Sequence, residues 1–276
     1  QGLHEFTVTD EHRKNATHAY SGMISYIDRK IGALRDALTN CGMADDTVII
    51  FAADHGEMMG ERGMWYKQHF FEWAAHVPLI FHAPSRWSPS RVTENCSLID
   101  IMPTLLDLAN DKPFVEYVDS IDGNSLVNAL HNDTSSLNDT AISEFAADGS
   151  TGPSRMVKKA NLKYMDLEGE ESLLFDLKTD PHELKNLIAD QDYAESAAEL
   201  ASICEADWSR KEMYETIFAN QRRRLKVHQA TGGDQTYVNI VRLNDGQRYI
   251  RNDSAADTKA RARLPYVEGA KPDKKS

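Results

Sequence analysis

Residues 47–56 read Thr47-Val-Ile-Ile-Phe-Ala-Ala53-Asp54-His55-Gly56. The first seven form a short, continuously apolar run that is rich in β-branched side chains. Such a run is typical of a strand buried on both faces, as in a parallel sheet covered by helices. Asp54 and His55 follow at its carboxyl end, where open α/β sheets bind their ligands. The run therefore predicts both the fold class and the place of a functional site.

The flanking sequence fits an α/β pattern. Apolar residues recur at spacings of three and four over residues 9–41, which predicts a long helix that Thr9 or Asp10 caps and Gly42 ends. The further elements expected up to residue 150 are a buried strand at 77–82, a helix at 97–109 with Pro103 near its start, and a strand at 140–145. We interpret residues 1–150 as part of a large α/β domain.

The pattern changes after residue 150. Three short, half-polar runs predict strands of a small antiparallel sheet at residues 155–158, 162–165 and 172–176. Pro181 and an acidic first turn predict a helix start, and residues 190–226 predict a second long helix. We expect a sheet-and-helix subdomain over 151–226, followed by an extended tail over 227–276 whose last part is disordered.

The composition excludes several classes of protein. The 276 residues include 31 Lys and Arg against 43 Asp and Glu, a net charge of −12 with 41% hydrophobic residues. This is typical of a soluble globular protein and argues against a nucleic-acid or anionic-membrane binder; no apolar run is long enough to span a bilayer. Cys41, Cys96 and Cys204 lie far apart, which excludes a disulfide framework and a cysteine zinc site. Their pattern suits a reducing compartment, and we expect a cytoplasmic protein.

The residues after the first buried strand indicate the chemistry. Asp54 and His55 offer an oxygen and a nitrogen ligand to one divalent cation. Three glycines in the following loop let the backbone turn back, so that Lys67 can return to the metal. A cation and a lysine together suit an anionic tetrahedral group such as a sulfate or phosphate ester. The competing interpretation is a helix-capping aspartate beside a surface histidine.

The stretch from Asp54 to Glu72 resembles the second signature of the sulfatase family, within the alkaline-phosphatase superfamily. The resemblance continues through residues 75–80, 98–107 and 174–187. It implies part of an alkaline-phosphatase-like sheet with flanking helices, followed by a small antiparallel-sheet and helix subdomain. Within the family the likeness is to bacterial choline sulfatases, on residues 63–72, 143–149 and parts of the tail at 247–252 and 260–265.

This resemblance implies a role for each matching residue. Asp54 and His55 would be metal ligands, for Ca²⁺ or Mn²⁺ with Mg²⁺ possible. Lys67 would hold the sulfate and assist the leaving oxygen, and Glu144 would face the choline ammonium, which cannot donate an N–H hydrogen bond. The implied reaction is the hydrolysis of choline O-sulfate to choline and sulfate. The tail implies a homo-oligomer. The acidic charge balance predicts no nucleic-acid or membrane partner.

The family's nucleophile is a formylglycine made from the Cys or Ser of a C/S-x-P-x-R motif, and no cysteine or serine of this sequence fits that motif. We therefore expect the motif in an amino-terminal half that is missing here, and a chain that is inactive alone. Two alternatives stay open. One is a phosphonate monoester or phosphodiester hydrolase of the same superfamily, and the other is a non-catalytic partner or binding module.

Overall fold

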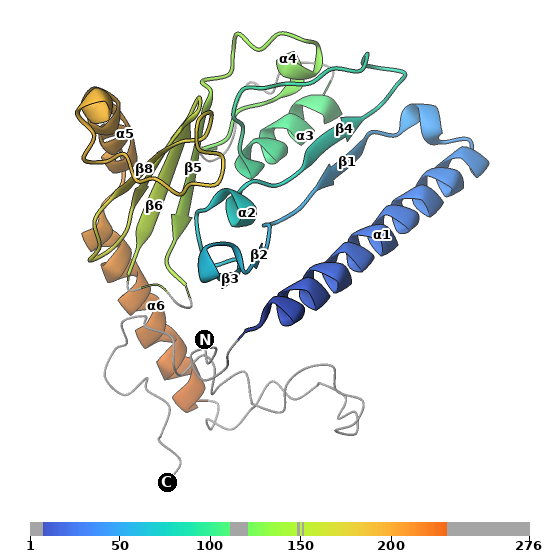
Figure 1. The fold of residues 1–276 in the computed structure, drawn as a ribbon. Coiled ribbons are helices and arrows are strands. Elements are labelled where there is room, and N and C mark those ends of the chain that lie inside the picture. The colour runs from blue at the N-terminus through green and yellow to red at the C-terminus, as the bar shows by residue number, and fades with distance from the viewer. Residues whose placement is uncertain (1–7, 111–120, 148–149, 151, 231–276) are drawn as a thin grey trace.

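The computed structural model describes residues 8–110, 121–147, 150 and 152–230. Figure 1 shows a long helix along one side, a two-stranded ribbon in the middle and a four-stranded sheet with two further helices on the other side. Smaller elements connect them: η2 (Ala44–Asp46), β2 (Met58–Met59), η3 (Glu61–Gly63), β3 (Trp65–Tyr66), α2 (Glu72–Ala75), α4 (Val127–Leu130) and η5 (Gln191–Tyr193). No helix of this described part is long and apolar enough to cross a membrane.

The predicted first helix is confirmed as α1, Asp10–Asn40. The Thr9 hydroxyl accepts a hydrogen bond from the His12 backbone N–H at 3.2 Å, which satisfies one free donor of the first turn. At the other end Gly42 adopts a φ of +69°, a left-handed conformation that glycine adopts at low cost. The apolar stripe that predicted the helix is largely exposed, and no residue of α1 is buried.

The two predicted apolar strands are present as β1 (Ile49–Ala52) and β4 (Leu79–His82). They pair with each other antiparallel, with Ile49 opposite His82, and both are half-exposed. The expectation of a parallel strand buried on both faces is therefore wrong for the described residues. A strand is buried only by the elements that cover it, and within the described ranges no third strand joins this ribbon.

The helix expected at 97–109 is also confirmed. It begins with a 3₁₀ turn, η4 (Leu98–Asp100), and continues as α3 (Ile101–Ala109). Asp100 accepts a hydrogen bond from the Ser97 backbone N–H at 2.7 Å, which fixes the entry of the chain. Pro103 and Thr104 are buried, and the Thr104 hydroxyl accepts from the Leu126 N–H at 2.8 Å, so α3 is tied to the start of α4.

The antiparallel sheet contains four strands in the order β5-β6-β7-β8. Their bounds are β5 (Thr140–Phe145), β6 (Ser154–Lys159), β7 (Leu162–Asp166) and β8 (Leu173–Asp176). We expected β5 in the large α/β part, and the structure has it as an edge strand of this sheet. It pairs with β6 along its whole length, because its apolar positions meet those of β6 on both faces.

Each face of this sheet carries one hydrophobic core. The first core joins the sheet to the segment between β2 and α2: Met58, Phe70, Phe71, Ala74, Met156, Met165 and Phe175. The second joins the opposite face to α5 (Ala194–Glu205): Val157, Tyr164, Leu174, Leu187, Leu200 and Cys204. Successive strand residues point to opposite faces, so the sheet is a layer between the 58–75 segment and α5.

Two helix predictions for the carboxyl-terminal part are wrong. The chain forms turns rather than a helix after Pro181, because Glu183 adopts a φ of +55° and its carboxylate is buried. The long helix expected at 190–226 is two helices, α5 and α6 (Arg210–Ala230). Arg155 donates to the carbonyls of Cys204 and Ala206 at 2.8 and 2.9 Å, which ends α5. The predicted tail beyond residue 230 lies outside the described residues.

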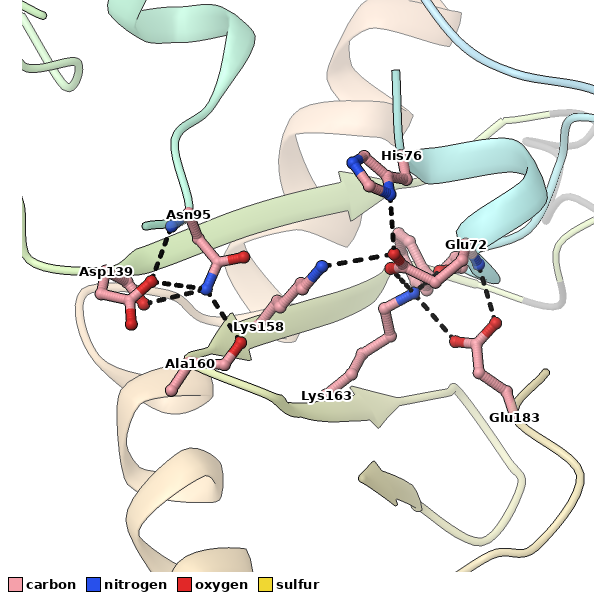
Figure 2. A network of polar contacts seen from close by, with 9 residues as sticks. Glu72, His76, Asn95, Asp139, Lys158, Ala160, Lys163 and Glu183 are labelled. Carbon is pink, nitrogen blue, oxygen red and sulfur yellow. Dashed lines mark hydrogen bonds and ion pairs between the residues drawn. The ribbon is translucent and has the colours of Figure 1, made fainter. Parts of the chain in front are cut away.

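A buried ionic network of Glu72, Lys163 and Glu183 connects the four-stranded sheet to α2 and to the turn at residue 183 (Figure 2). The Lys163 side chain on β7 is fully buried, and its Nζ lies 2.6 Å from Glu72 Oε1 and 2.9 Å from Glu183 Oε1. The same Nζ donates to the carbonyl of Phe70 at 2.9 Å. Because a buried charge is stable only when it is paired and hydrogen-bonded, Lys163 holds α2 and the 183 turn against the sheet.

We predict that Lys163→Met lowers the free energy of unfolding by ~3–5 kcal/mol, because it leaves two carboxylates facing each other without their counterion. Lys159→Met is the matched control on the same sheet, since Lys159 pairs with Glu199 where both side chains are about half exposed. Its effect should stay below ~1 kcal/mol. Urea unfolding measures both, and equal effects would contradict the structural role of Lys163.

Candidate active site

The turn that follows β1 brings two of the predicted site residues into contact. His55 Nδ1 lies 2.8 Å from the carbonyl oxygen of Gly56. A carbonyl oxygen only accepts, so we assign the ring hydrogen to Nδ1, which leaves a lone pair on Nε2. Nε2 in turn lies 3.5 Å from Asp54 Oδ2. The aspartate oxygen and the basic ring nitrogen are therefore close together.

This arrangement fits one divalent cation. Two ligands with metal bonds of about 2.0–2.2 Å lie about 3 Å apart or slightly more, and the observed separation is 3.5 Å. The bond from Nδ1 to a backbone carbonyl is the arrangement that orients metal-binding histidines. Within the described residues no group of three or more His, Cys, Asp or Glu side chains could hold a metal ion. The spacing of Asp54 and His55 thus fits two positions of a ligand set, and the described residues complete no such set around them.

Gly56 fixes the position of this turn against α2. Its N–H donates to the carbonyl of Ala74 at 2.8 Å, and the Glu57 N–H donates to that of Trp73, also at 2.8 Å. A Cβ at position 56 would lie 2.1 Å from the Trp73 oxygen, so only glycine allows this approach. The sequence analysis assigned the glycine to backbone freedom, and close approach is its actual reason.

The loop behind the turn folds back on itself as a short hairpin. β2 pairs antiparallel with β3, with Met58 opposite Tyr66, and the chain between them contains left-handed residues at Gly60 and Gly63. Lys67 follows β3 directly and is exposed. The loop therefore returns this lysine to the side of the molecule that carries the Asp54–His55 turn.

One open groove of about 1580 Å³ collects the predicted site residues on its walls. Those residues are Asp54, His55, Lys67 and Glu144. Glu72 of the ionic network and Lys158 of β6 also line it. The lining carries charges of both signs, since it also includes Arg86, Arg91 and Glu94.

Glu144 has a partner that the sequence analysis did not predict. Its Oε1 lies 3.3 Å from Arg155 Nε, directly across the strand pair. Ile142, two positions earlier, packs into the core beside α5, whereas Phe145 packs against the opposite core. Strand alternation therefore places the Glu144 side chain on the α5 face. It is a paired carboxylate at the margin of the groove, 42% exposed.

No sequence pattern predicts the three residues of the ionic network: Glu72, Lys163 and Glu183. Burial alone would raise the pKa of Glu72, but a hydrogen bond from His76 and the charges of Lys163 and Lys158 outweigh it and lower that pKa well below its ordinary value of 4.5. Glu72 is therefore ionised at neutral pH. Nothing in the sequence indicates that Lys163 is buried, because a lysine between apolar strand residues normally indicates an exposed position.

Comparisons with known proteins identify the family of this chain. A family model described as sulfatase matches residues 3–111, and one described as N-sulphoglucosamine sulphohydrolase, C-terminal, matches residues 60–218. The choline-sulfatase of Rhizobium meliloti (strain 1021) is 34% identical over 258 residues, 92% of this chain and 50% of that protein. The arylsulfatase of Clostridium perfringens (strain 13 / Type A) is 34% identical over 186 residues, 66% of this chain and 38% of that protein.

The solved structures show the same fold. The phosphonate monoester hydrolase of Agrobacterium radiobacter superposes with a TM-score of 0.63 at 33% identity, covering 70% of this chain and 41% of that one. The fold is thus the α/β fold of the alkaline-phosphatase-like hydrolases. The chain belongs to the sulfatase family. It spans about half the length of the Rhizobium relative.

We predict that Glu72 makes the stability of the protein depend on pH. Its pKa is lowered in the folded state, so its contribution is fully present above the unfolded-state pKa and is lost as pH falls through the folded-state value. Urea unfolding of wild type and Glu72→Gln between about pH 6 and pH 3 should therefore show a shrinking difference in unfolding free energy. A difference that stays constant would contradict this assignment.

Proposed function

We propose that this chain supplies the metal-binding pair and the sulfate-binding lysine of a sulfatase that hydrolyses choline O-sulfate. The observation that carries the proposal is the 3.5 Å between Asp54 Oδ2 and the unprotonated Nε2 of His55, two acceptor atoms that a shared cation would bridge, in one groove with Lys67. The family membership supports the reaction class, a sulfuric ester hydrolysis. The Rhizobium choline-sulfatase, similar over 92% of the chain, supports the substrate.

Each residue has a distinct task in this proposal. Asp54 and His55 would hold a divalent cation, Ca²⁺ or Mn²⁺, and a bound cation supplies Lewis-acid stabilisation of negative oxygens. His55 keeps its proton on Nδ1, so that Nε2 stays available as a ligand. Lys67 places an ammonium against the oxygens of the sulfate and balances the charge that develops on the leaving oxygen.

The nucleophile lies outside this sequence in the proposed account. The family's formylglycine is made within C/S-x-P-x-R, and none of the 276 residues forms that motif. The exposed stripe of α1, with Met23, Ile24, Ile27 and Leu34 each about half exposed, supports a further polypeptide segment that covers it. We infer that the chain alone releases no sulfate.

Glu144 remains the proposed partner of the choline ammonium. Its ion pair with Arg155 means that a quaternary ammonium would share this carboxylate with a guanidinium. A carboxylate held at a fixed place by Arg155 can still orient a cation that approaches from the groove.

A phosphonate monoester hydrolase is the second candidate function, because the Agrobacterium structure is 33% identical with a TM-score of 0.63. A binding module without catalysis is the third. A substrate panel separates the first two, and turnover in the presence of a nucleophile-bearing segment excludes the third.

We also propose where the domains divide, which the sequence predicts at residues 150 and 226, and a role of the tail in assembly. The four-stranded sheet crosses residue 150, since β5 pairs with β6, so we propose that the subdomain begins before β5. A homo-oligomer formed through residues 227–276 is proposed from the resemblance to choline sulfatases alone.

The first experiment is a titration of the purified chain with Mn²⁺ and, separately, Ca²⁺. We predict binding of one ion that Asp54→Asn and His55→Gln each weaken by about tenfold or more, as loss of one ligand does. His18→Gln, on the exposed surface of α1, is the control and should bind like wild type. Binding that neither site variant changes would contradict the metal site.

The substrate assignment is tested in an enzyme that joins this chain to a segment bearing C/S-x-P-x-R. Glu144→Gln should raise the KM for choline O-sulfate by about tenfold, a difference of ~1.4 kcal/mol, and leave a neutral aryl sulfate nearly unaffected. Glu199→Gln, another carboxylate about half exposed, is the matched control. Equal effects of Glu144→Gln on both substrates would show that it acts only through Arg155.

A further inference from the structure

We propose that Glu72, Lys163 and Glu183 are positioning residues, which hold the Asp54–His55 turn in its cation-binding geometry from the far side of α2. This inference rests on the proposed metal-binding role of that turn. None of the three residues needs to touch the cation. Their effect passes through α2, the short helix on which the turn lies.

The turn depends on α2 for its position. Gly56 and Glu57, directly after His55, both donate backbone hydrogen bonds to α2 carbonyls. A four-residue helix has no independent stability. The network supplies what the helix lacks, because the Glu72 N–H at its start donates to Glu183 Oε2 at 2.7 Å.

Both carboxylate oxygens of Glu72 have ion-pair partners. Lys163 Nζ lies 2.6 Å from Oε1, while Lys158 Nζ and His76 Nδ1 lie 3.2 and 3.0 Å from Oε2. Lys158 and Lys163 stand on β6 and β7, the two central strands of the sheet. Figure 2 shows both lysines reaching from the sheet to Glu72. The start of α2 is therefore fixed to the most rigid element nearby.

Glu183 also holds the loop that leads to Lys67. The Arg62 guanidinium donates to the backbone carbonyl of Glu183 and lies 4.4 Å from the centroid of the Phe71 ring. Arg62 itself has a φ of +56° within that loop. One buried residue thus contacts both the helix under the metal-binding turn and the loop that returns the lysine.

A merely stabilising network would have a different consequence. It would change the global stability of the fold and leave the local geometry of the turn intact. Loss of a positioning network displaces the turn while the rest of the fold stays intact. A small displacement is enough to weaken cation binding, since ligands must be held within about 0.5 Å of their productive positions. Local opening can be distinguished from global unfolding by amide hydrogen exchange.

The test uses Glu183→Gln, which keeps the shape of the side chain and removes its charge. Two measurements are made on the full chain: hydrogen exchange of the Gly56 and Glu57 amides, and the Kd for Mn²⁺. Leu174→Ala is the matched control, because Leu174 is fully buried in the core beside α5, on the opposite face of the sheet. Urea unfolding reports the global stability of each variant.

We expect Glu183→Gln to accelerate hydrogen exchange at the Gly56 and Glu57 amides about tenfold beyond the acceleration that its loss of global stability explains. We also expect it to raise the Kd for Mn²⁺ by about tenfold. Leu174→Ala should lower global stability and change neither quantity beyond that effect. Exchange at Gly56 and Glu57 that follows global stability in both variants would overturn the inference.

Two further results keep the outcome decisive. If Glu183→Gln does not fold, Lys158→Met is used instead, because it removes one contact to Glu72 at the groove surface. It should also accelerate exchange at the Gly56 and Glu57 amides. Unchanged exchange in that variant would overturn the inference. If wild type binds no Mn²⁺, the proposed metal function fails and the cation part of this inference with it. The amide exchange still decides whether the network positions the turn.

Discussion

The ammonium group of Lys163 must be neutralised where it stands, and the architecture follows from that constraint. The side chain is fully buried, so an unpaired charge there would cost several kcal/mol. Glu72 and Glu183 meet this need from segments far apart in the chain. Once they do, α2 lies against the four-stranded sheet and the turn after β1 lies against α2. A network that appears purely structural therefore determines where the proposed cation ligands stand.

The sequence predicts local features well and long-range pairings poorly. The bounds of α1 and β5 follow from apolar periodicity and from caps such as Thr9, which act within one or two turns of the chain. The Asp54–His55 site, which stays a prediction, rests on its place at a strand end and on the family signature. The antiparallel pairing of β1 with β4 could not be predicted, because a short apolar run looks the same in either direction. Pro181 was expected to start a helix, and the buried Glu183 carboxylate overrides that local preference.

The site is chemically coherent and incomplete. In the proposed site one ring nitrogen and one carboxylate oxygen lie close together, with a lysine in the same groove. No group of three or more metal-binding side chains occurs among the described residues, and no part of the sequence forms a C/S-x-P-x-R motif. Family models for sulfatases match along the chain, which spans about half of its Rhizobium relative. The proposed function assigns this chain one side of an active centre.

The most direct measurement is the anomalous scattering of a crystal of the chain soaked in Mn²⁺. The account predicts one peak about 2.0–2.5 Å from both His55 Nε2 and a carboxylate oxygen of Asp54, with the hydrogen bond from Nδ1 to the Gly56 carbonyl retained. A crystal that binds Mn²⁺ at other residues, with this pair in contact with water alone, would contradict the account.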